Sequence, residues 1–426
     1  MAVREALPTS GRSLGRAYWR LWTSSGLSNL ADGVFKVALP LVAIQFTRSP
    51  TLIAGLTFAV TIPWLLFALP AGALADRRDR RRVMLGANVV RAGLLGAVVT
   101  AILLDVDTIW MLYLVAFCIG VAETMYDTSA QSIVPQLVRR DQLSRANGRL
   151  YAVELTANEF VGPPLAGLLA AAGAAIAFAA PASLWVVAVA ALLLVPGRFR
   201  VERDVPAPDG GAPKRTTIRT DIAEGLRFLW RHRLLRTFAL MVGATNFAGN
   251  AVMAILVLYA VGEGSAMQLS GQAFGLLLST IAAGSLVGSL VAEWFERTLG
   301  RALTLGLSFA TRVVFLGVPA LTTNPYIIGA AFFLGGAGTI AANVVMVSLR
   351  QRITPDRLLG RINSGYRLIA WGTIPLGAVT GGLLAQWTSI STVFVVMAVV
   401  SLLVLAGLAV TTNERMDAAE RDADFH

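Results

Sequence analysis

Residues 72–82 have the sequence GALADRRDRRR, which places five arginines within eleven residues. Long apolar runs stand on both sides of this stretch, at about 51–74 and 83–104. A run of roughly 20 apolar residues is long enough to cross a bilayer as a helix, whereas clustered arginines are excluded from its hydrocarbon core. The stretch is therefore predicted to be a short basic loop that joins two membrane spans.

The same alternation of apolar runs and polar connections continues along the whole chain. The composition agrees with it, because 56% of the residues are apolar and only 14% are charged. A soluble domain would carry roughly 25% charged residues. We predict an all-α membrane protein with twelve transmembrane helices, at about 21–46, 51–74, 83–104, 108–129, 148–171, 174–195, 237–261, 270–294, 302–321, 325–347, 363–386 and 390–411.

Basic residues gather on alternate connections. The N-terminal tail, the even-numbered connections and the C-terminal tail hold most of the arginines, whereas the odd-numbered connections hold Arg48 and little else that is basic. Cytoplasmic loops are enriched in Lys and Arg. Both termini are therefore predicted to lie in the cytoplasm, in a multi-pass protein of the inner membrane. This distribution also explains the net charge of +11 without nucleic-acid binding, since no separate basic module is present.

The two halves of the chain resemble each other at an offset of about 215–217 residues. Ser28-Asn29-Leu30-Ala31-Asp32 matches Thr245-Asn246-Phe247-Ala248-Gly249, and Arg91 falls near Arg312. Because each half holds six spans, the repeats are parallel, and two such bundles can expose one central site to each side in turn. The predicted parts are an N-terminal bundle (1–195), a cytoplasmic linker with an amphipathic helix (196–236), a C-terminal bundle (237–411) and a disordered cytoplasmic tail (412–426).

Two motifs give the sequence a resemblance to a known family. Residues 72–82 resemble the loop signature Gly-x-x-x-Asp-Arg-x-Gly-Arg-Arg of the major facilitator superfamily, with Asp79 in place of the second glycine. Residues 162–167 are similar to the fifth-helix motif Gly-Pro-x-x-Gly-Gly of drug–proton antiporters, with Ala166 in place of one glycine. The fourth-span arginine of many such antiporters is missing. Within the superfamily, residues 28–33, 38–41, 135–138 and 224–229 look like the enterobactin-exporter and macrolide-efflux-like group.

The resemblance implies the major facilitator fold, with two pseudo-symmetric six-helix bundles, and a role in export. It also implies roles for two sets of residues. In the basic loop, close helix approach at Gly72 and polar contacts of the charged residues would latch one conformation. A plain cytoplasmic loop would also explain the arginines, but not Gly72 and Asp76. In the fifth helix, the motif would kink the span and permit tight packing. The residues are Gly72, Asp76, Arg77 and Arg81 in the loop, and Gly162, Pro163 and Gly167 in the helix.

Several charged residues fall inside the predicted spans. Each costs about 2.5–3.5 kcal/mol at the centre of a membrane helix, so it must pair, face a wet cavity or take up a proton. The acids concentrate in the first half, which favours proton coupling there and substrate contact in the second half. Asp32 is the first candidate for coupling, and a buried structural pair with Lys36 or Arg91 is the alternative. The candidates for the coupling and substrate cavity are Asp32, Lys36, Arg91, Glu123, Asp127, Glu159 and Arg312, with Tyr366 and Trp371 as possible lining.

These observations predict a secondary active transporter. It would export a small amphipathic molecule, such as a drug, macrolide or siderophore, by alternating access coupled to protons, and it would work as a monomer within the lipid bilayer. We expect no enzyme activity, no cofactor and no metal, because there is no Walker loop and the chain has one cysteine and two histidines. The alternatives are a lysophospholipid flippase or importer of the same fold, and a membrane-embedded transferase, for which the external loops look too short.

Overall fold

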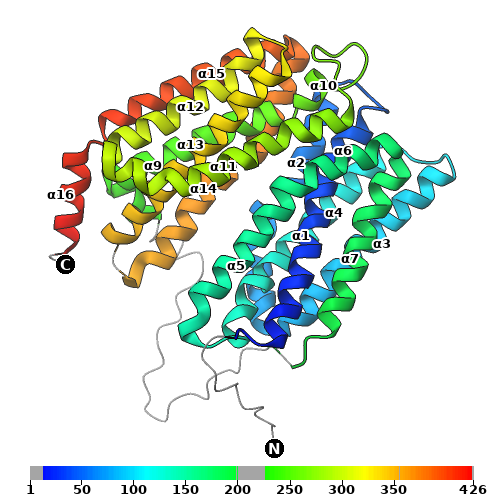
Figure 1. The fold of residues 1–426 in the computed structure, drawn as a ribbon, viewed down its shortest axis with the longest axis horizontal. Coiled ribbons are helices and arrows are strands. Elements are labelled where there is room, and N and C mark those ends of the chain that lie inside the picture. The colour runs from blue at the N-terminus through cyan, green and yellow to red at the C-terminus, as the bar shows by residue number, and fades with distance from the viewer. Residues whose placement is uncertain (1–12, 198, 200–225, 355, 425–426) are drawn as a thin grey trace, which may run out of the picture. The chain divides into compact units, whose positions relative to one another are not determined.

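The computed structural model describes residues 13–197, 199, 226–354 and 356–424. Within that part of the chain, every regular element is helical apart from one isolated bridge between Val261 and Leu269 (Figure 1). Helices satisfy their backbone hydrogen bonds within one segment, which is the condition for a chain that crosses hydrocarbon.

The described residues of the first half form seven helices and three short turns: α1 (Arg16–Ala43), α2 (Pro50–Arg77), α3 (Arg80–Leu103), α4 (Ile109–Ile133), η1 (Val134–Gln136), η2 (Arg140–Gln142), α5 (Leu143–Leu155), the π-helical turn η3 (Thr156–Val161), α6 (Gly162–Ala172) and α7 (Ala174–Leu193). The second half contains α9 (Arg233–Met253), α10 (Leu256–Ala260), α11 (Gly271–Leu299), α12 (Arg301–Leu321), α13 (Pro325–Ile353), α14 (Asp356–Trp387), α15 (Ile390–Val404), η4 (Leu405–Ala409) and α16 (Asn413–Asp424).

Ten of the described helices are long and apolar enough to cross a membrane. The predicted all-α membrane fold is therefore confirmed. The other two predicted spans, 148–171 and 237–261, fall on interrupted helices. The first is divided into α5, η3 and α6, and the second into α9 and α10.

The interruption of the fifth span has a local cause. Pro163 and Pro164 have no backbone N–H, so the carbonyls one turn before them lose their ordinary helical partners. The backbone forms the π turn η3 directly before Gly162. Single π turns of this kind are frequent at functional sites. The predicted disturbance of the helix by this motif thus takes the form of a widened turn.

The prediction of a disordered tail is wrong for residues 413–424, which form α16. The Asn413 side-chain oxygen accepts a hydrogen bond from the backbone N–H of Ala302 at 2.9 Å. Glu420 pairs with Arg301 at 3.0 Å and with Arg352 at 3.4 Å. These contacts hold a strongly polar helix against the ends of α12 and α13. Its stability comes from tertiary partners, which its composition alone does not reveal.

The predicted linker, 196–236, lies mostly outside the described residues. Of its amphipathic helix, residues 226–231 are helical. Leu229 is fully buried in the apolar core that also contains Leu235 and Phe238 from α9. This part of the segment therefore packs against protein through its apolar face.

The chain forms two compact units. The first comprises α1 up to Ala38, α2 from Leu66 onwards and α3 to α7, and the second comprises residues 39–65 together with α9 to α16. Within the second unit, Arg48 donates a hydrogen bond to the Val261 carbonyl at 2.9 Å. That bond gives a structural role to the single arginine that stood apart from the basic connections.

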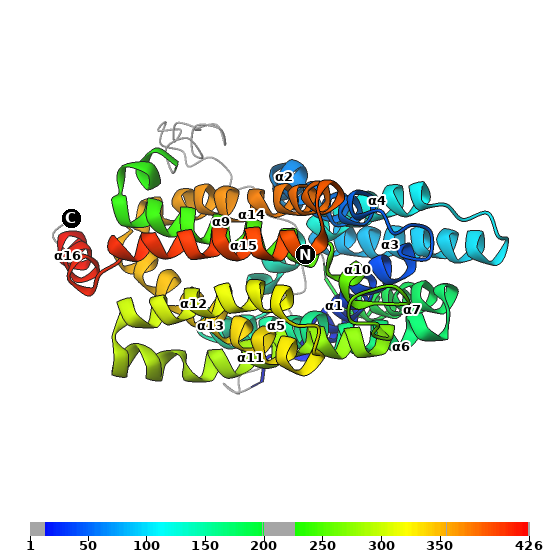
Figure 2. The ribbon, with the colours of Figure 1, turned by 90° about the horizontal axis from the view of Figure 1, so that it is seen from above.

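The helices of both units pack in a corresponding order. In the first unit α3 packs against α4 and α7, and in the second α12 packs against α13 and α15. Figure 2 shows α9, α14 and α15 lying along one another in the second unit, where each contacts the other two. The matching pattern of neighbours agrees with the internal repeat found in the sequence.

Candidate functional site: a charged cluster and a polar cavity

Three helices of the first unit bring five ionisable side chains together. Asp32 and Lys36 come from α1, Arg91 from α3, and Glu123 and Asp127 from α4. Residues four apart lie on the same face of a helix, which explains how α1 and α4 each contribute two of them. We call these five residues the N-terminal charged cluster.

Asp32 and Arg91 form the most deeply buried pair of this cluster. One Arg91 nitrogen, Nη1, lies 3.1 Å from Asp32 Oδ1 and 3.2 Å from Oδ2. The Arg91 side chain is fully buried and that of Asp32 is 4% exposed. The guanidinium also lies over the rings of Tyr126 and Trp185, at 5.1 and 5.5 Å from their centroids. Such cation–π contacts stabilise a cation that has been removed from water.

Lys36 pairs with Glu123 rather than with Asp32. Its ammonium nitrogen lies 2.8 Å from Glu123 Oε1. The Lys36 side chain is 41% exposed and that of Glu123 is 9% exposed. The two ion pairs of the cluster therefore differ in access: the Asp32–Arg91 pair is sealed, whereas the Lys36–Glu123 pair has an open side.

Asp127 is the third acid of the cluster and has no comparable partner. Its side chain is half-buried and lies one helical turn after Glu123. Among the described residues it makes neither an ion pair nor a hydrogen bond. With three carboxylates and two cations, the fully ionised cluster carries one uncompensated negative charge. A half-buried carboxylate without a counter-ion is a group that proton uptake would stabilise.

Glu159 makes no ion pair with a residue of this cluster, although its charge reaches Lys36. It lies in the π turn η3, and its side chain is exposed. The neighbouring residue Asn158 instead faces α1, where it donates a hydrogen bond to the Asn29 side-chain oxygen at 2.7 Å. The π turn thus ties the fifth span to α1 one turn away from Asp32.

Gly162 and Gly33 allow these two helices to touch. A β-carbon at Gly162 would stand 2.8 Å from the Gly33 backbone, and one at Gly33 would stand 2.6 Å from the Asn158 carbonyl oxygen. Both distances are too short for real atoms, so each position requires glycine. Pro163 and Gly167, the other motif residues, are also buried. The arrangement supports close packing as one role of this motif.

The basic loop organises the ends of neighbouring helices. Arg81 donates to the carbonyls of Leu192 and Leu193, at 3.0 and 2.7 Å, where α7 ends. A cation is favourable at a helix C-terminus because of the helix dipole and its unpaired carbonyls. Asp79, which replaces the usual glycine, caps α3 by accepting hydrogen bonds from the backbone of Arg81 and Arg82. Its φ of −67° needs no glycine.

For Gly72, Asp76 and Arg77, the other candidate residues of the loop motif, the structure describes no contact that joins neighbouring helices. Arg77 is exposed, and the side chain of Asp76 lies outside the described residues. A β-carbon at Gly72 would meet no described atom within 4 Å. The close helix approach predicted at Gly72 is therefore not made by the part of the chain that the structure describes.

Several residues around Arg91 were missed by sequence reasoning. Ser28 lies 3.4 Å from Arg91 Nη1 and donates a hydrogen bond to Asn88 at 3.1 Å. Tyr126 and Trp185 cover the guanidinium, as described above. Ser28 and Asn88 could have been suspected because they are polar residues inside apolar runs. Tyr126 and Trp185 carried no such signal, since aromatic residues are common throughout membrane helices.

The second unit contains a polar cavity of about 210 Å³. It is bordered by α9, α12, α13 and α14. Arg312 is the only charged residue among its described lining residues. Tyr366 and Trp371, suggested from the sequence as lining, both border it. Its lining residues are Val242, Thr245, Asn246, Ser308, Phe309, Arg312, Gly338, Thr339, Ile340, Ala342, Asn343, Met346, Tyr366, Ala370 and Trp371.

Arg312 has no carboxylate partner within the described residues, nor any hydrogen bond to them. Its Nε is buried without an acceptor. The guanidinium lies 4.5 Å from the centroid of the Phe315 ring. It also lies so close to Gly249 that a β-carbon there would overlap it. Arg312 is thus a poorly compensated cation at the wall of the cavity.

This cavity corresponds to the charged cluster through the internal repeat. Asp32 corresponds to Gly249, Glu123 to Thr339 and Asp127 to Asn343, while Arg91 falls near Arg312. Each of these three acids of the cluster is thus replaced by a neutral residue, whereas an arginine is present in both halves. The two halves place different chemistry at equivalent positions.

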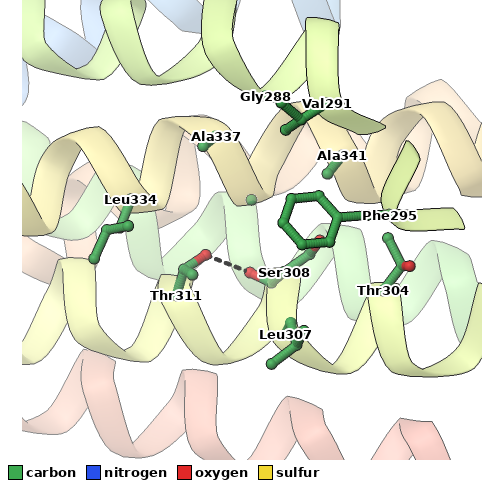
Figure 3. Close-up of a pocket in the computed structure, with 11 residues that line it drawn as sticks. Gly288, Val291, Phe295, Thr304, Leu307, Ser308, Thr311, Leu334, Ala337 and Ala341 are labelled. Carbon is green, nitrogen blue, oxygen red and sulfur yellow. Dashed lines mark hydrogen bonds between the residues drawn. The ribbon is translucent and has the colours of Figure 1, made fainter. Parts of the chain in front are cut away.

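A second, apolar cavity of about 150 Å³ lies among α11, α12 and α13 (Figure 3). It shares Ser308 and Gly338 with the polar cavity, and none of the described residues that line it is charged. The hydroxyls of Thr304 and Thr311 donate to backbone carbonyls of their own helix, each at 2.8 Å. This second cavity therefore offers apolar surface and few free donors.

The fold is shared with solved transporters. The nucleoside transporter NupG matches with a TM-score of 0.72 at 12% identity, over 93% of this chain and 98% of that one. A bacterial homologue of the iron transporter ferroportin, in its inward-facing state, matches with a TM-score of 0.71 at 18% identity, over 93% and 99%. At these identities the likeness concerns the fold alone.

The sequence as a whole places the chain more narrowly: it belongs to the family described as transmembrane secretion effectors, whose model matches residues 14–425. The multidrug efflux pump Tap of Mycolicibacterium fortuitum is 28% identical over 87% of this chain and 90% of its own length. The enterobactin exporter EntS of Shigella boydii is 26% identical over 88% and 87%. Macrolide efflux protein A of Streptococcus pyogenes is 23% identical over 36% and 37%.

These findings confirm the predicted superfamily and the resemblance to exporters. The chain is a multi-pass membrane transporter of small molecules and not an enzyme. The alternative of a membrane-embedded transferase is thereby excluded.

Proposed function

We propose that this chain is a proton-coupled exporter of small amphipathic molecules. The proposal places it in the inner membrane with both termini in the cytoplasm, where it acts as a monomer by alternating access. Its working parts are the bundles 1–195 and 237–411, joined by the linker 196–236. The curated relatives named as efflux pumps and as an enterobactin exporter support the outward direction.

One observation carries the coupling part of the proposal: the N-terminal charged cluster holds one more carboxylate than cations. Asp32 and Glu123 each have a basic partner, while Asp127 has none among the described residues. Binding one proton at Asp127 would make the cluster neutral. Releasing it would restore a negative charge beside Glu123. A change of charge at such a site can favour one conformation of a carrier over another.

The geometry shifts the first candidate for coupling from Asp32 to Asp127. The sealed contact of Asp32 with Arg91 supports the structural alternative that the sequence left open. Lys36 and Glu123 form a second pair with an open side, through which a proton could reach Asp127. Arg91 serves in this scheme as the counter-ion of Asp32, and the exposed Glu159 remains a candidate for the access route.

An efflux assay tests the proposal. The chain is expressed in a host that lacks its own drug pumps, and the accumulation of fluorescent amphipathic dyes and of a macrolide is measured with and without a protonophore. We expect lower accumulation of at least one compound than with an empty vector, and recovery of accumulation when the protonophore is added. Accumulation above the empty-vector level would indicate an importer and would contradict the proposed direction.

The variant Asp127→Asn tests the coupling residue within the same assay. It removes the titrating group and nearly preserves the shape of the side chain, so we expect efflux to fall to the empty-vector level at unchanged protein abundance. Asp105→Asn is the matched control, because Asp105 is exposed in the connection between α3 and α4. Full proton-driven efflux by Asp127→Asn would remove this residue from the mechanism.

A further inference from the structure

We propose that the polar cavity of the second unit recognises an anionic group on the transported molecule, with the Arg312 guanidinium as the principal contact. The substrate class is then an amphipathic anion, such as an aromatic carboxylate. This inference deepens the proposed function and rests on it, since it names the chemistry of the cargo. It concerns residues of the second unit only and is independent of the coupling cluster.

The first argument comes from the donors that remain available in the cavity. The hydroxyls of Thr245 and Thr339 each donate to a carbonyl one turn earlier on their own helix, at 2.7 Å. The Asn246 amide donates to the Ala370 carbonyl, also at 2.7 Å. These donors are already used. Arg312 and the exposed amide of Asn343 make no hydrogen bond to a described residue, so both can donate to a ligand.

The second argument is the absence of an internal counter-ion. The only acids between residues 237 and 411 are Glu263, Glu293, Glu296 and Asp356. Of these, the three glutamates, whose side chains the structure describes, do not line the cavity. At the equivalent place in the first unit, Asp32 neutralises Arg91. Here Gly249 stands in the place of Asp32 and packs against the guanidinium. A desolvated cation is costly unless it is paired, so a ligand anion would supply what the chain itself omits.

The third argument concerns the remainder of the ligand. Phe309, Tyr366 and Trp371 border the same cavity. Trp371 also contacts Trp64 edge-on at 5.5 Å, within the same unit. Aromatic and apolar side chains around a few oriented polar groups are typical of small-molecule sites. The lining therefore suits a molecule with a flat apolar body and one negatively charged end.

A pair of matched probes tests this inference. 1-Naphthoate carries a carboxylate and 1-naphthamide is its neutral counterpart, with the same ring system. Binding of each is measured by isothermal titration calorimetry on the purified full chain in detergent. We expect the wild-type protein to bind naphthoate more tightly than naphthamide. Equal binding of the two probes, or no binding of naphthoate, would overturn the proposal.

Variants at Arg312 assign the preference to this residue. Arg312→Gln should weaken naphthoate binding by roughly tenfold to a hundredfold, the range expected for losing a charge-assisted hydrogen bond. Naphthamide binding should change little. Arg312→Lys keeps the charge and should keep part of the preference. Arg297→Gln is the control, since Arg297 pairs with Glu293 on the exposed surface of α11. An equal loss of both probes in Arg312→Gln would count against anion recognition.

Gly249→Asp provides a second, opposite test. It places a carboxylate where the first unit has Asp32, so Arg312 would gain an internal partner. The guanidinium is the end of a flexible side chain and can yield to the new atoms. We expect selective loss of naphthoate binding with naphthamide binding retained. Undiminished naphthoate binding by a folded Gly249→Asp protein would contradict the proposal.

The binding and efflux measurements can refute the anion site and the proposed exporter separately. Loss of the probe preference with intact proton-driven efflux would overturn the anion site and leave the proposed exporter. Intact probe preference with no efflux of any compound would overturn the exporter and leave the site.

Discussion

Asp32 and Arg91 form a buried ion pair, so the role of Asp32 in coupling must be separated from its role in stability. Removing one partner of a buried ion pair typically costs about 3–5 kcal/mol, because the other charge is left uncompensated. We expect Asp32→Asn to lower the stability of the purified protein by that order. The double variant Asp32→Asn with Arg91→Gln should lose less than the sum of the two single variants, since partners in contact are not additive.

Unfolding midpoints of the three variants in detergent measure this coupling, and efflux assays on the same proteins separate the roles. A stable double variant that still exports would make the pair structural. A stable double variant without efflux would return Asp32 to the coupling mechanism. Additive losses of stability would show that the two side chains do not interact as the structure indicates.

The contact between α1 and the fifth span depends on glycine at both helices. In Gly162→Ala, the new methyl group would press on the Gly33 backbone, which lies 2.8 Å from its position. Overpacking of this kind costs about 1–3 kcal/mol. We therefore expect a lower unfolding temperature and reduced efflux, because the helices must separate near Asp32 and η3.

Gly96→Ala is the matched control for that variant. Gly96 lies within α3, and a β-carbon there would meet no described atom within 4 Å. Alanine is a better helix former than glycine by roughly 0.5–1 kcal/mol, so this control should be neutral or slightly stabilising. A Gly162→Ala protein as stable as the Gly96→Ala protein would show that the close contact is not required.

Orientation of the whole chain in the membrane follows from the placement of its arginines. We expect both termini on the cytoplasmic side and the connection at 262–269 on the opposite side. Cys118 is the only cysteine, so Cys118→Ser gives a background without thiols. In spheroplasts, Ala266→Cys on this background should react with a membrane-impermeant maleimide, whereas Ser13→Cys should react only after permeabilisation. Both positions are exposed. Labelling of Ser13→Cys in intact spheroplasts would reverse the orientation.

The two halves of the molecule share a helix arrangement but carry different charged residues at equivalent positions. The first keeps acids at Asp32, Glu123 and Asp127, and the second keeps only Arg312 at the equivalent positions. In the proposed exporter, this divergence assigns proton binding to one half and substrate recognition to the other. Gene duplication of a six-helix unit would supply both halves with the same packing, after which a few substitutions would suffice to separate the two tasks.

The membrane spans and their repeat could be predicted from the residues alone, and the superfamily from the resemblance of two motifs, residues 72–82 and 162–167, to known ones. A span is a local property, because about 20 apolar residues must satisfy their own backbone hydrogen bonds in hydrocarbon. The arginines of residues 77–82 and of the other even-numbered connections carry the orientation signal in the same local way. Asp32, Arg91 and Arg312 stood out because charged residues inside apolar runs are rare.

Pairing of those charges was decided by tertiary structure. Lys36 stands four residues from Asp32 on the same helix, yet it pairs with Glu123, while Asp32 takes Arg91 from α3. Those choices depend on how α1, α3 and α4 are rotated against one another, which follows from packing over the whole bundle. Tertiary structure also decided that Arg312 has no carboxylate partner among the described residues. It likewise decided the order of α16, because Arg301 and Arg352 lie where Glu420 can reach them.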